Sequence, residues 1–167
     1  TVLRLKHKLR GRSYVGGIFT DTHQGELDSR TYGLDGQWFF NNYLSFSGNV
    51  ISVDEENIGD ENMAVTGNLD YTSDPFGFGI VYNKIGKNFD PEMGYVRRKG
   101  FEKNRLQLRR SVRTAGYPIR RFSVNGTGNW LYSTEGPLES SSKNARVDVD
   151  FESGENFSFN VNKQFER

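Results

Sequence analysis

Residues 89–98, with the sequence Phe-Asp-Pro-Glu-Met-Gly-Tyr-Val-Arg-Arg, are the part of the chain whose side chains are best suited to chemistry. Pro91 fixes its own φ and Gly94 permits a bend, so we expect an ordered turn here rather than a slack loop. The residues of this candidate structural or ligand-binding loop are Phe89, Asp90, Pro91, Glu92, Gly94, Tyr95, Arg97 and Arg98.

Two adjacent arginines give this loop two alternative roles. Arg97 and Arg98 could pair with the nearby carboxylates of Asp90 and Glu92, or they could bind an anionic ligand through bidentate hydrogen bonds. We favour the first interpretation, in which ion pairs hold a structural loop that folds back over, or into, the lumen of a barrel.

The other polar clusters do not form a catalytic or metal-binding constellation. The acidic segment 54–62 lacks the alternating ligand order of a dedicated calcium loop, so we expect a solvated loop. His23 and Glu26 have no nearby Ser or Cys that could act as a nucleophile with them. The two histidines, His7 and His23, lack metal-ligand spacing, and the chain has no cysteine. We therefore predict no catalytic residues, no metal, no cofactor and no enzymatic activity.

The elements that position these groups are short segments in which apolar and polar residues alternate. Segment 63–71 has Val65, Leu69 and Tyr71 in one phase and Asn68 and Asp70 in the other. Side chains on a strand point to opposite faces with a period of two, so this pattern predicts strands with one apolar and one polar face. Segment 121–132 repeats the pattern.

We predict an all-β fold, an antiparallel up-and-down meander of about ten strands and essentially no helix, since only the connection 86–101 is long enough to contain one. The expected strands are 2–9, 13–20, 31–40, 43–53, 62–72, 76–85, 102–113, 119–133, 143–152 and 156–167. Short turns should alternate with longer loops, which we expect at 21–30, 54–61, 86–101 and 134–142. Short turns on one side and long loops on the other are typical of an outer-membrane β-barrel.

Composition agrees with a barrel that crosses a membrane with strands. Hydrophobic residues make up 34% of the chain and the mean hydropathy is −0.72, and no apolar run approaches the roughly 20 residues of a membrane helix. Strands of a membrane barrel are half polar, so they remain possible. Lys and Arg together number 22 against 21 Asp and Glu, a balance that gives no argument for nucleic-acid binding.

Aromatic residues gather at both ends of the expected strands, where amphipathic rings favour the two membrane interfaces. Those beside the short turns are Trp38, Phe40, Tyr71, Phe76, Phe151 and Phe157, and those near the long loops are Tyr32, Trp130 and Tyr132. A soluble barrel would place the same residues at the two ends of a core.

The polar phase would line a wet interior that contains both signs of charge. Its candidate lumen-lining residues are Asn49, Asn68, Asp70, Arg105, Gln107, Arg109, Asn125 and Asn160. Three polar residues, His7, Arg110 and Lys163, fall instead in the apolar phase. Arg110 lies close to a short turn, from which a long side chain can reach the interface. His7, nearer the middle of its expected strand, counts mildly against this register.

Several strings together resemble a known family: Leu3-Arg4-Leu5-Lys6, residues 11–20, residues 32–36, residues 87–98 and residues 151–155. The chain resembles the uncharacterised C-terminal outer-membrane β-barrel region of Gram-negative, Bacteroidota-type proteins that carry an N-terminal domain similar to carbohydrate-binding module family nine. The string at 89–98 is the specific element of this likeness, and the others support it.

The resemblance implies that residues 1–167 are a single segment of a larger outer-membrane barrel, with no second domain. Its implied partners are outer-membrane lipid and the remaining strands of the same protein, with surface or periplasmic assembly proteins or glycans as further candidates. It supplies no catalytic residues, and sugar binding cannot be carried over to any residue of this chain. We expect a non-enzymatic role in solute passage or in surface anchoring and assembly. The alternative is a soluble, lipocalin-like barrel that binds a small ligand inside.

Overall fold

The chain folds into one antiparallel β-sheet, as seen in a computed structural model that describes residues 1–24, 27–55, 59–92, 94–114 and 118–167. Its strands are β1 (Val2–Lys8), β2 (Tyr14–Gln24), β3 (Leu27–Phe39), β4 (Leu44–Glu55), β5 (Met63–Thr72), β6 (Phe76–Ile85), β7 (Phe101–Arg113), β8 (Ile119–Ser133), β9 (Leu138–Phe151) and β10 (Asn156–Glu166). The described residues contain no helix. The predicted all-β meander of about ten strands is thus confirmed.

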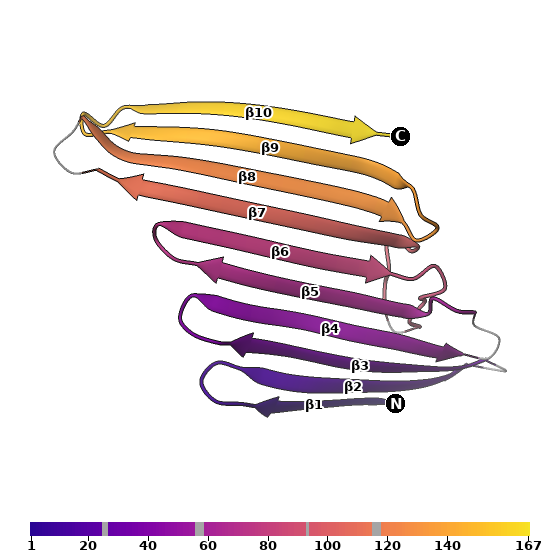
Figure 1. Cartoon of the computed structure of the whole chain (residues 1–167). Helices are drawn as coiled ribbons and strands as arrows, with labels where there is room; N and C mark the ends of the chain where they lie inside the picture. The colour runs from indigo at the N-terminus through magenta and orange to yellow at the C-terminus, as the bar shows by residue number, and fades with distance from the viewer. Residues whose placement is uncertain (25–26, 56–58, 93, 115–117) are drawn as a thin grey trace.

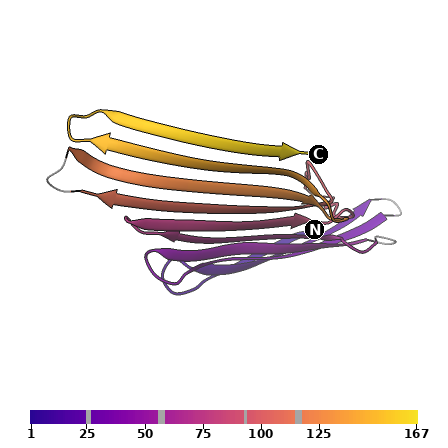
Figure 2. The same cartoon turned by 45° about the horizontal axis from the view of Figure 1, so that its top comes forward.

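Each strand pairs only with its neighbours in the sequence, in the order β1 to β10 (Figure 1). β1 and β10 therefore form the two edges of an open sheet, and within the described residues they pair with β2 and β9 alone. Figure 2 shows that the sheet is curved and twisted, with the indigo strands turned out of the plane of the yellow ones. No helix in the described part of the chain is long and apolar enough to cross a membrane.

The predicted alternation of loop lengths is wrong at two places. β2 and β3 continue through most of the expected loop 21–30, and Gln24 pairs with Leu27. β9 begins at Leu138, which leaves only 134–137 as a connection. Polar residues occupy both faces of these strand ends, so the apolar alternation stops before the strands do. Backbone pairing with the neighbouring strand continues beyond that point.

Strand register gives the sheet one apolar face, because directly paired residues lie on the same side. One row of paired positions across β3–β7 consists of Trp38, Phe46, Leu69, Ile80 and Leu106. We call the side of the sheet that carries this row the apolar face.

The opposite side, the polar face, has hydrophilic rows. Asp35, Asn49, Thr66, Asn83 and Lys103 occupy one such row across β3–β7. The predicted two-phase pattern thus holds from strand to strand.

Little of the apolar face is buried. Leu34 is 68% exposed, Phe159 is 56% exposed and Val124 is 38% exposed. The small buried core lies on the polar face instead, where Phe89, from the 86–100 connection, packs with Val53 and Ala64. The sheet is therefore a single layer with one uncovered hydrophobic side.

Candidate functional site

All eight residues predicted to line a lumen lie on the polar face. Asn49 and Asn68 belong to polar rows of β4 and β5, and Asn125 pairs with Arg109 across β7 and β8. The full set on this face is Asn49, Asn68, Asp70, Arg105, Gln107, Arg109, Asn125 and Asn160. The structure thus brings the predicted residues to one side of the sheet.

Long polar side chains cross over glycines on this face and join strands that are not neighbours. Arg4 on β1 forms an ion pair with Asp35 on β3, across Gly16 of β2. A Cβ atom at Gly16 would lie 2.9 Å from the Asp35 Oδ1 atom, which is closer than real Cβ atoms come. The absence of a side chain at this position makes room for the bridge.

Arg109 makes a similar crossing near the short turns. Its Nη2 atom donates a hydrogen bond of 2.6 Å to the backbone carbonyl of Ser73, in the turn between β5 and β6. Arg109 is paired with Gly77, whose Cβ position would lie 3.5 Å from the arginine Nε atom. Side chains thus tie the turn to the sheet.

A second network ties β8, β9 and β10 together. The Arg121 Nη2 atom lies 2.6 Å from the Asp150 carboxylate, and Asn156 donates a 2.7 Å hydrogen bond to the same residue. Arg146 and Asp148 pair at 2.8 Å, and the Ser158 hydroxyl donates to Asp148. The alternation phase places all six residues on the polar side, but sequence reasoning missed the ion pairs because they depend on strand register.

Further along β9 and β10, the amide of Asn144 donates to the Asn160 Oδ1 atom at 2.7 Å. Asn160 was predicted as lumen-lining. Here it is also a link between the last two strands.

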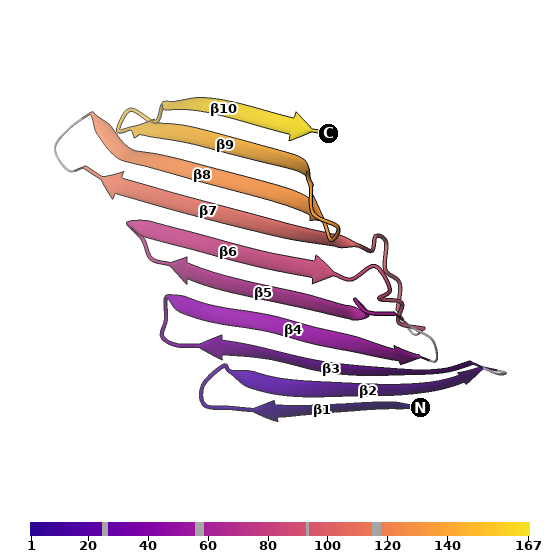
Figure 3. The same cartoon turned by 45° about the vertical axis from the view of Figure 1, so that its right-hand side comes forward.

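The loop between β6 and β7 folds back over the polar face, as its preferred interpretation predicts. Phe89 is 4% exposed and packs on Val53 and Ala64. Asn88 donates a 2.5 Å hydrogen bond to the Asp60 carbonyl oxygen. Figure 3 shows the segment passing the ends of β5 and β4 before it returns to β7.

The ion pairs of this loop differ from those expected. Arg98 pairs with Glu139 on β9, and Asp90 pairs with Lys99 at 2.5 Å. The prediction that Arg98 pairs with Asp90 or Glu92 is therefore wrong. The reason is that the loop runs above the sheet, where a strand distant in sequence offers the closer carboxylate.

The predicted turn is present between Pro91 and Gly94, because the Gly94 N–H donates to the Pro91 carbonyl at 2.9 Å. Glu92 is exposed, and Met93 lies outside the described residues. Tyr95 and Arg97 are exposed and line a hollow between the loop and the polar face.

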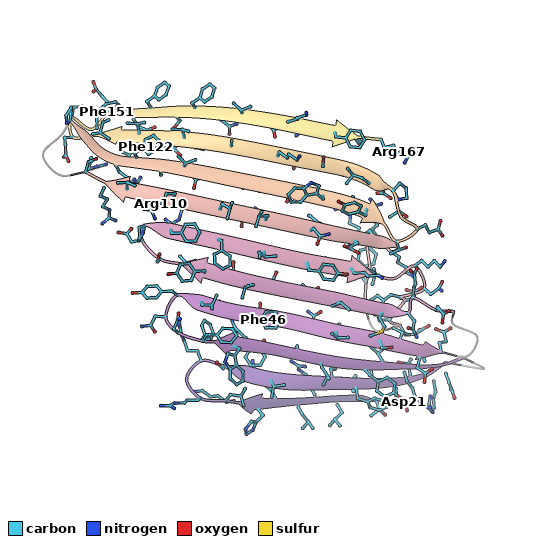
Figure 4. The ribbon with its side chains drawn as sticks, viewed as in Figure 1. Asp21, Phe46, Arg110, Phe122, Phe151 and Arg167 are labelled. Carbon is cyan, nitrogen blue, oxygen red and sulfur yellow. The ribbon has the colours of Figure 1, made fainter. Side chains whose placement is uncertain are left out.

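The apolar face ends in charged or aromatic residues on either side. At the end beyond Phe19 and Tyr32, Arg30 lies 3.3 Å from Asp21 on the same face. Tyr32 was expected near a strand end, but it lies within β3. It marks the point at which the apolar band gives way to these polar residues of β2 and β3. Figure 4 shows Asp21 at one end of the strands, and Arg110 and Phe122 toward the other end, where the short turns lie.

Aromatic rings cluster beside the short turns. Tyr71 stacks on Phe78 with ring centroids 5.6 Å apart, and it also lies 6.1 Å from Phe76 and 6.3 Å from Tyr43. The two tryptophans, Trp38 and Trp130, both lie on the apolar face.

The three polar exceptions lie on the apolar face near its margins. His7 is next to the last residue of β1, close to the short-turn end rather than in mid-strand, which removes the argument against the register. Arg110 is paired with Phe76, the first residue of β6. Lys163 lies opposite Lys143, toward the other end.

The remaining sequence candidates form no metal site among the described residues. His23 lies 3.2 Å from Asp28 and 3.7 Å from Asp21, within the β2–β3 hairpin. No group of three or more His, Asp or Glu side chains placed to hold a metal ion occurs in the described ranges. Part of the acidic segment 54–62, residues 56–58, and residues 25–26 of the His23 segment lie outside them.

Comparisons with protein-family models, with curated proteins and with solved structures find no match to this chain. By its fold and its polar networks, the chain is a single-layer antiparallel meander with one apolar and one polar face, and with a loop folded onto the polar face.

Proposed function

We propose that this chain is a wall segment of an outer-membrane β-barrel in a Gram-negative bacterium, with its apolar face toward lipid and its polar face toward the barrel interior. The observation that carries the proposal is the uncovered apolar face. Burying one large apolar side chain stabilises a structure by about 1.5–3 kcal/mol. Leaving a whole face of such residues in water would be strongly unfavourable, and contiguous patches of this kind mark membrane or protein contacts.

The height of the apolar band suits a bilayer. On β8 it runs from Phe122 to Tyr132, which is ten steps of about 3.4 Å, or about 34 Å along the strand. At a barrel tilt of about 40°, this corresponds to about 26 Å along the membrane normal, against a typical apolar band of about 25 Å. The aromatic cluster at the short turns and the charged pair of Arg30 and Asp21 would then lie at the two interfaces.

A soluble, lipocalin-like barrel is less well supported. It would pack Val124 and Phe159 inward against other apolar side chains. Both are substantially exposed, and the buried cluster around Phe89 lies on the polar face.

The polar face supports a passive role in solute passage or in anchoring a surface assembly. Its ion pairs, such as those of Arg121 with Asp150 and Arg4 with Asp35, combine both charge signs, and the residues that the structure describes form no ring of a single sign that would select one ion. The loop that carries Phe89 would narrow such an interior. Glycans or assembly proteins on either side of the membrane are the partners we propose besides lipid.

The edges β1 and β10 would need strand partners in lipid. Each unpaired backbone group in hydrocarbon costs several kcal/mol, because no water is present to bind it. We propose that further strands of the same protein pair with these two edges.

Lipid contact can be tested with tryptophan fluorescence. The assay uses proteins with one tryptophan each. Two variants retain either Trp38 or Trp130, and two others lack both and contain Ile80→Trp or Thr127→Trp. Each variant is reconstituted in bilayers of lipids brominated at different depths. We expect the strongest quenching of the Ile80→Trp variant by bromine near the bilayer centre, because Ile80 lies in mid-band on the apolar face. Thr127→Trp, on the polar face at a similar height, should be quenched weakly. Equal quenching at both positions would contradict the proposal.

Passage can be tested by reconstituting the full-length protein in planar bilayers and recording conductance with and without oligosaccharides. Stepwise channels that sugars block would support transport, whereas a silent bilayer would favour anchoring or assembly.

A further inference from the structure

A hollow of about 930 Å³ lies between the returning part of the β6–β7 loop and the polar face of β7–β10. The loop contributes Tyr95, Val96, Arg97 and Arg98 to its lining. This volume is at the upper end of the range for small-molecule sites, which span about 300–1,000 Å³.

The charges around this hollow are unevenly satisfied. Arg98 is paired with Glu139, but Arg97 and Lys103 have no acidic group within 4.0 Å among the described residues. Glu166 is the acidic residue of the lining, so the two cations outnumber it. The lining of the hollow therefore has a net positive charge, and the charged groups of Arg97 and Lys103 are available to bind an anion.

The rest of the lining combines rings with hydrogen-bonding groups. The Tyr95 side chain is 91% exposed at the mouth of the hollow, and Phe101 lies below the Arg98 guanidinium, whose carbon is 5.7 Å from the ring centroid. Asn129 donates a 3.0 Å hydrogen bond to the Ser142 hydroxyl, and both have further hydrogen-bonding capacity.

We propose that this hollow binds a small organic oxyanion, a carboxylate or phosphate ester that carries a ring. Arg97 and Lys103 would bind the oxyanion, since guanidinium and ammonium groups form the strongest hydrogen bonds with such groups. The ring would lie against Tyr95 and Phe101. Because the hollow is on the polar face, its ligand would come from the aqueous side and not from a lipid headgroup. The inference depends on this face alone and not on conduction.

The test measures binding of phenyl phosphate and benzoate to the full chain, folded in nonionic detergent, by saturation-transfer NMR titration. Inorganic phosphate supplies the charge without the ring, and phenyl glucoside supplies a neutral ring. The variants are Arg97→Gln, Lys103→Gln, Tyr95→Ala and the matched control Arg10→Gln, which removes an exposed cation in the β1–β2 turn. Far-UV circular dichroism and the midpoint of urea unfolding establish that each variant is folded.

We expect saturable one-to-one binding of phenyl phosphate, weakened about tenfold by Arg97→Gln and by Lys103→Gln, as removal of a charged hydrogen bond predicts. Tyr95→Ala should weaken phenyl phosphate but not inorganic phosphate, and Arg10→Gln should change neither. Absence of saturable binding, equal losses in Arg10→Gln, or equal affinity for phenyl glucoside would overturn the proposal. Binding lost in the two cation variants with silent bilayers would uphold this site and count against passage, so that the two outcomes are distinguishable.

Discussion

A depth series of arginine substitutions on β6 tests the apolar face most directly. Phe76 and Ile80 share that face and are four steps apart, about 14 Å along the strand. At a tilt of about 40°, the position of Ile80 is about 10 Å deeper along the membrane normal. Phe76 is paired with Arg110, so the sequence already contains an arginine at the height of Phe76.

The expected costs differ because water and headgroups are within reach only near the interface. Arginine at the midplane of a barrel wall costs about 2–4 kcal/mol, and near the interface about 0–1 kcal/mol. We therefore expect Ile80→Arg to lower the free energy of unfolding by about 2–4 kcal/mol and Phe76→Arg by less than about 1 kcal/mol. Thr127→Arg, on the polar face between Gln107 and Asn144, serves as the control and should cost less than about 1 kcal/mol.

The assay is reversible urea unfolding of the full protein in phospholipid vesicles, followed by the fluorescence of Trp38 and Trp130. The reasoning would be refuted if Phe76→Arg and Ile80→Arg cost the same, or if Thr127→Arg cost as much as Ile80→Arg. A folded, monodisperse monomer without detergent would refute it independently, since the apolar face would then require no lipid.

Three further substitutions test the packing and the polar networks by denaturant titration. Phe89→Ala should cost about 3 kcal/mol by emptying the small buried core and should open the 86–100 loop to proteolysis, with Phe89→Leu as the milder control; a cost below about 1 kcal/mol would contradict its anchoring role. Gly16→Val should cost about 1–3 kcal/mol by displacing the ion pair that crosses it, whereas Gly126→Val, with open space around its Cβ position, should cost less; similar values would show that the crossing is unimportant. Asp150→Asn should lower the unfolding midpoint, because the amide replaces a carboxylate that pairs with Arg121 at 2.6 Å and accepts a hydrogen bond from Asn156; an unchanged midpoint would show that the ion pair contributes nothing.

The fold was predictable because alternation in a strand is a local signal. Polar residues such as Asn49, Asn125 and Asn160 could be assigned to one face from their phase alone, and pairing then kept them together. The turn at Pro91–Gly94 was predictable for the same reason, since its backbone requirements are contained in a few adjacent residues.

Features that depend on the surroundings were not predictable. The strand positions 21–24 lack apolar alternation because they extend past the hydrophobic band, yet backbone pairing with β3 maintains the strand. Likewise, β9 begins with Leu138 and Glu139, followed by three serines that show no apolar alternation, and pairing with β8 makes this segment a strand. The partner of Arg98 is 41 residues away in sequence, and only the path of the loop over the sheet determines it.

The strict order of the strands has a consequence for how such a sheet can vary. Because every ladder joins strands that are consecutive in the chain, the unit of construction is the hairpin. Duplicating or deleting a whole hairpin would change the width of the wall and preserve both strand direction and the two faces. Gaining or losing one strand would reverse the direction of everything after it, and a slip of one residue would exchange the faces. The 86–100 loop, held on β4, β5 and β9, and the Arg4–Asp35 bridge between β1 and β3 are links that such a change could disturb at a distance.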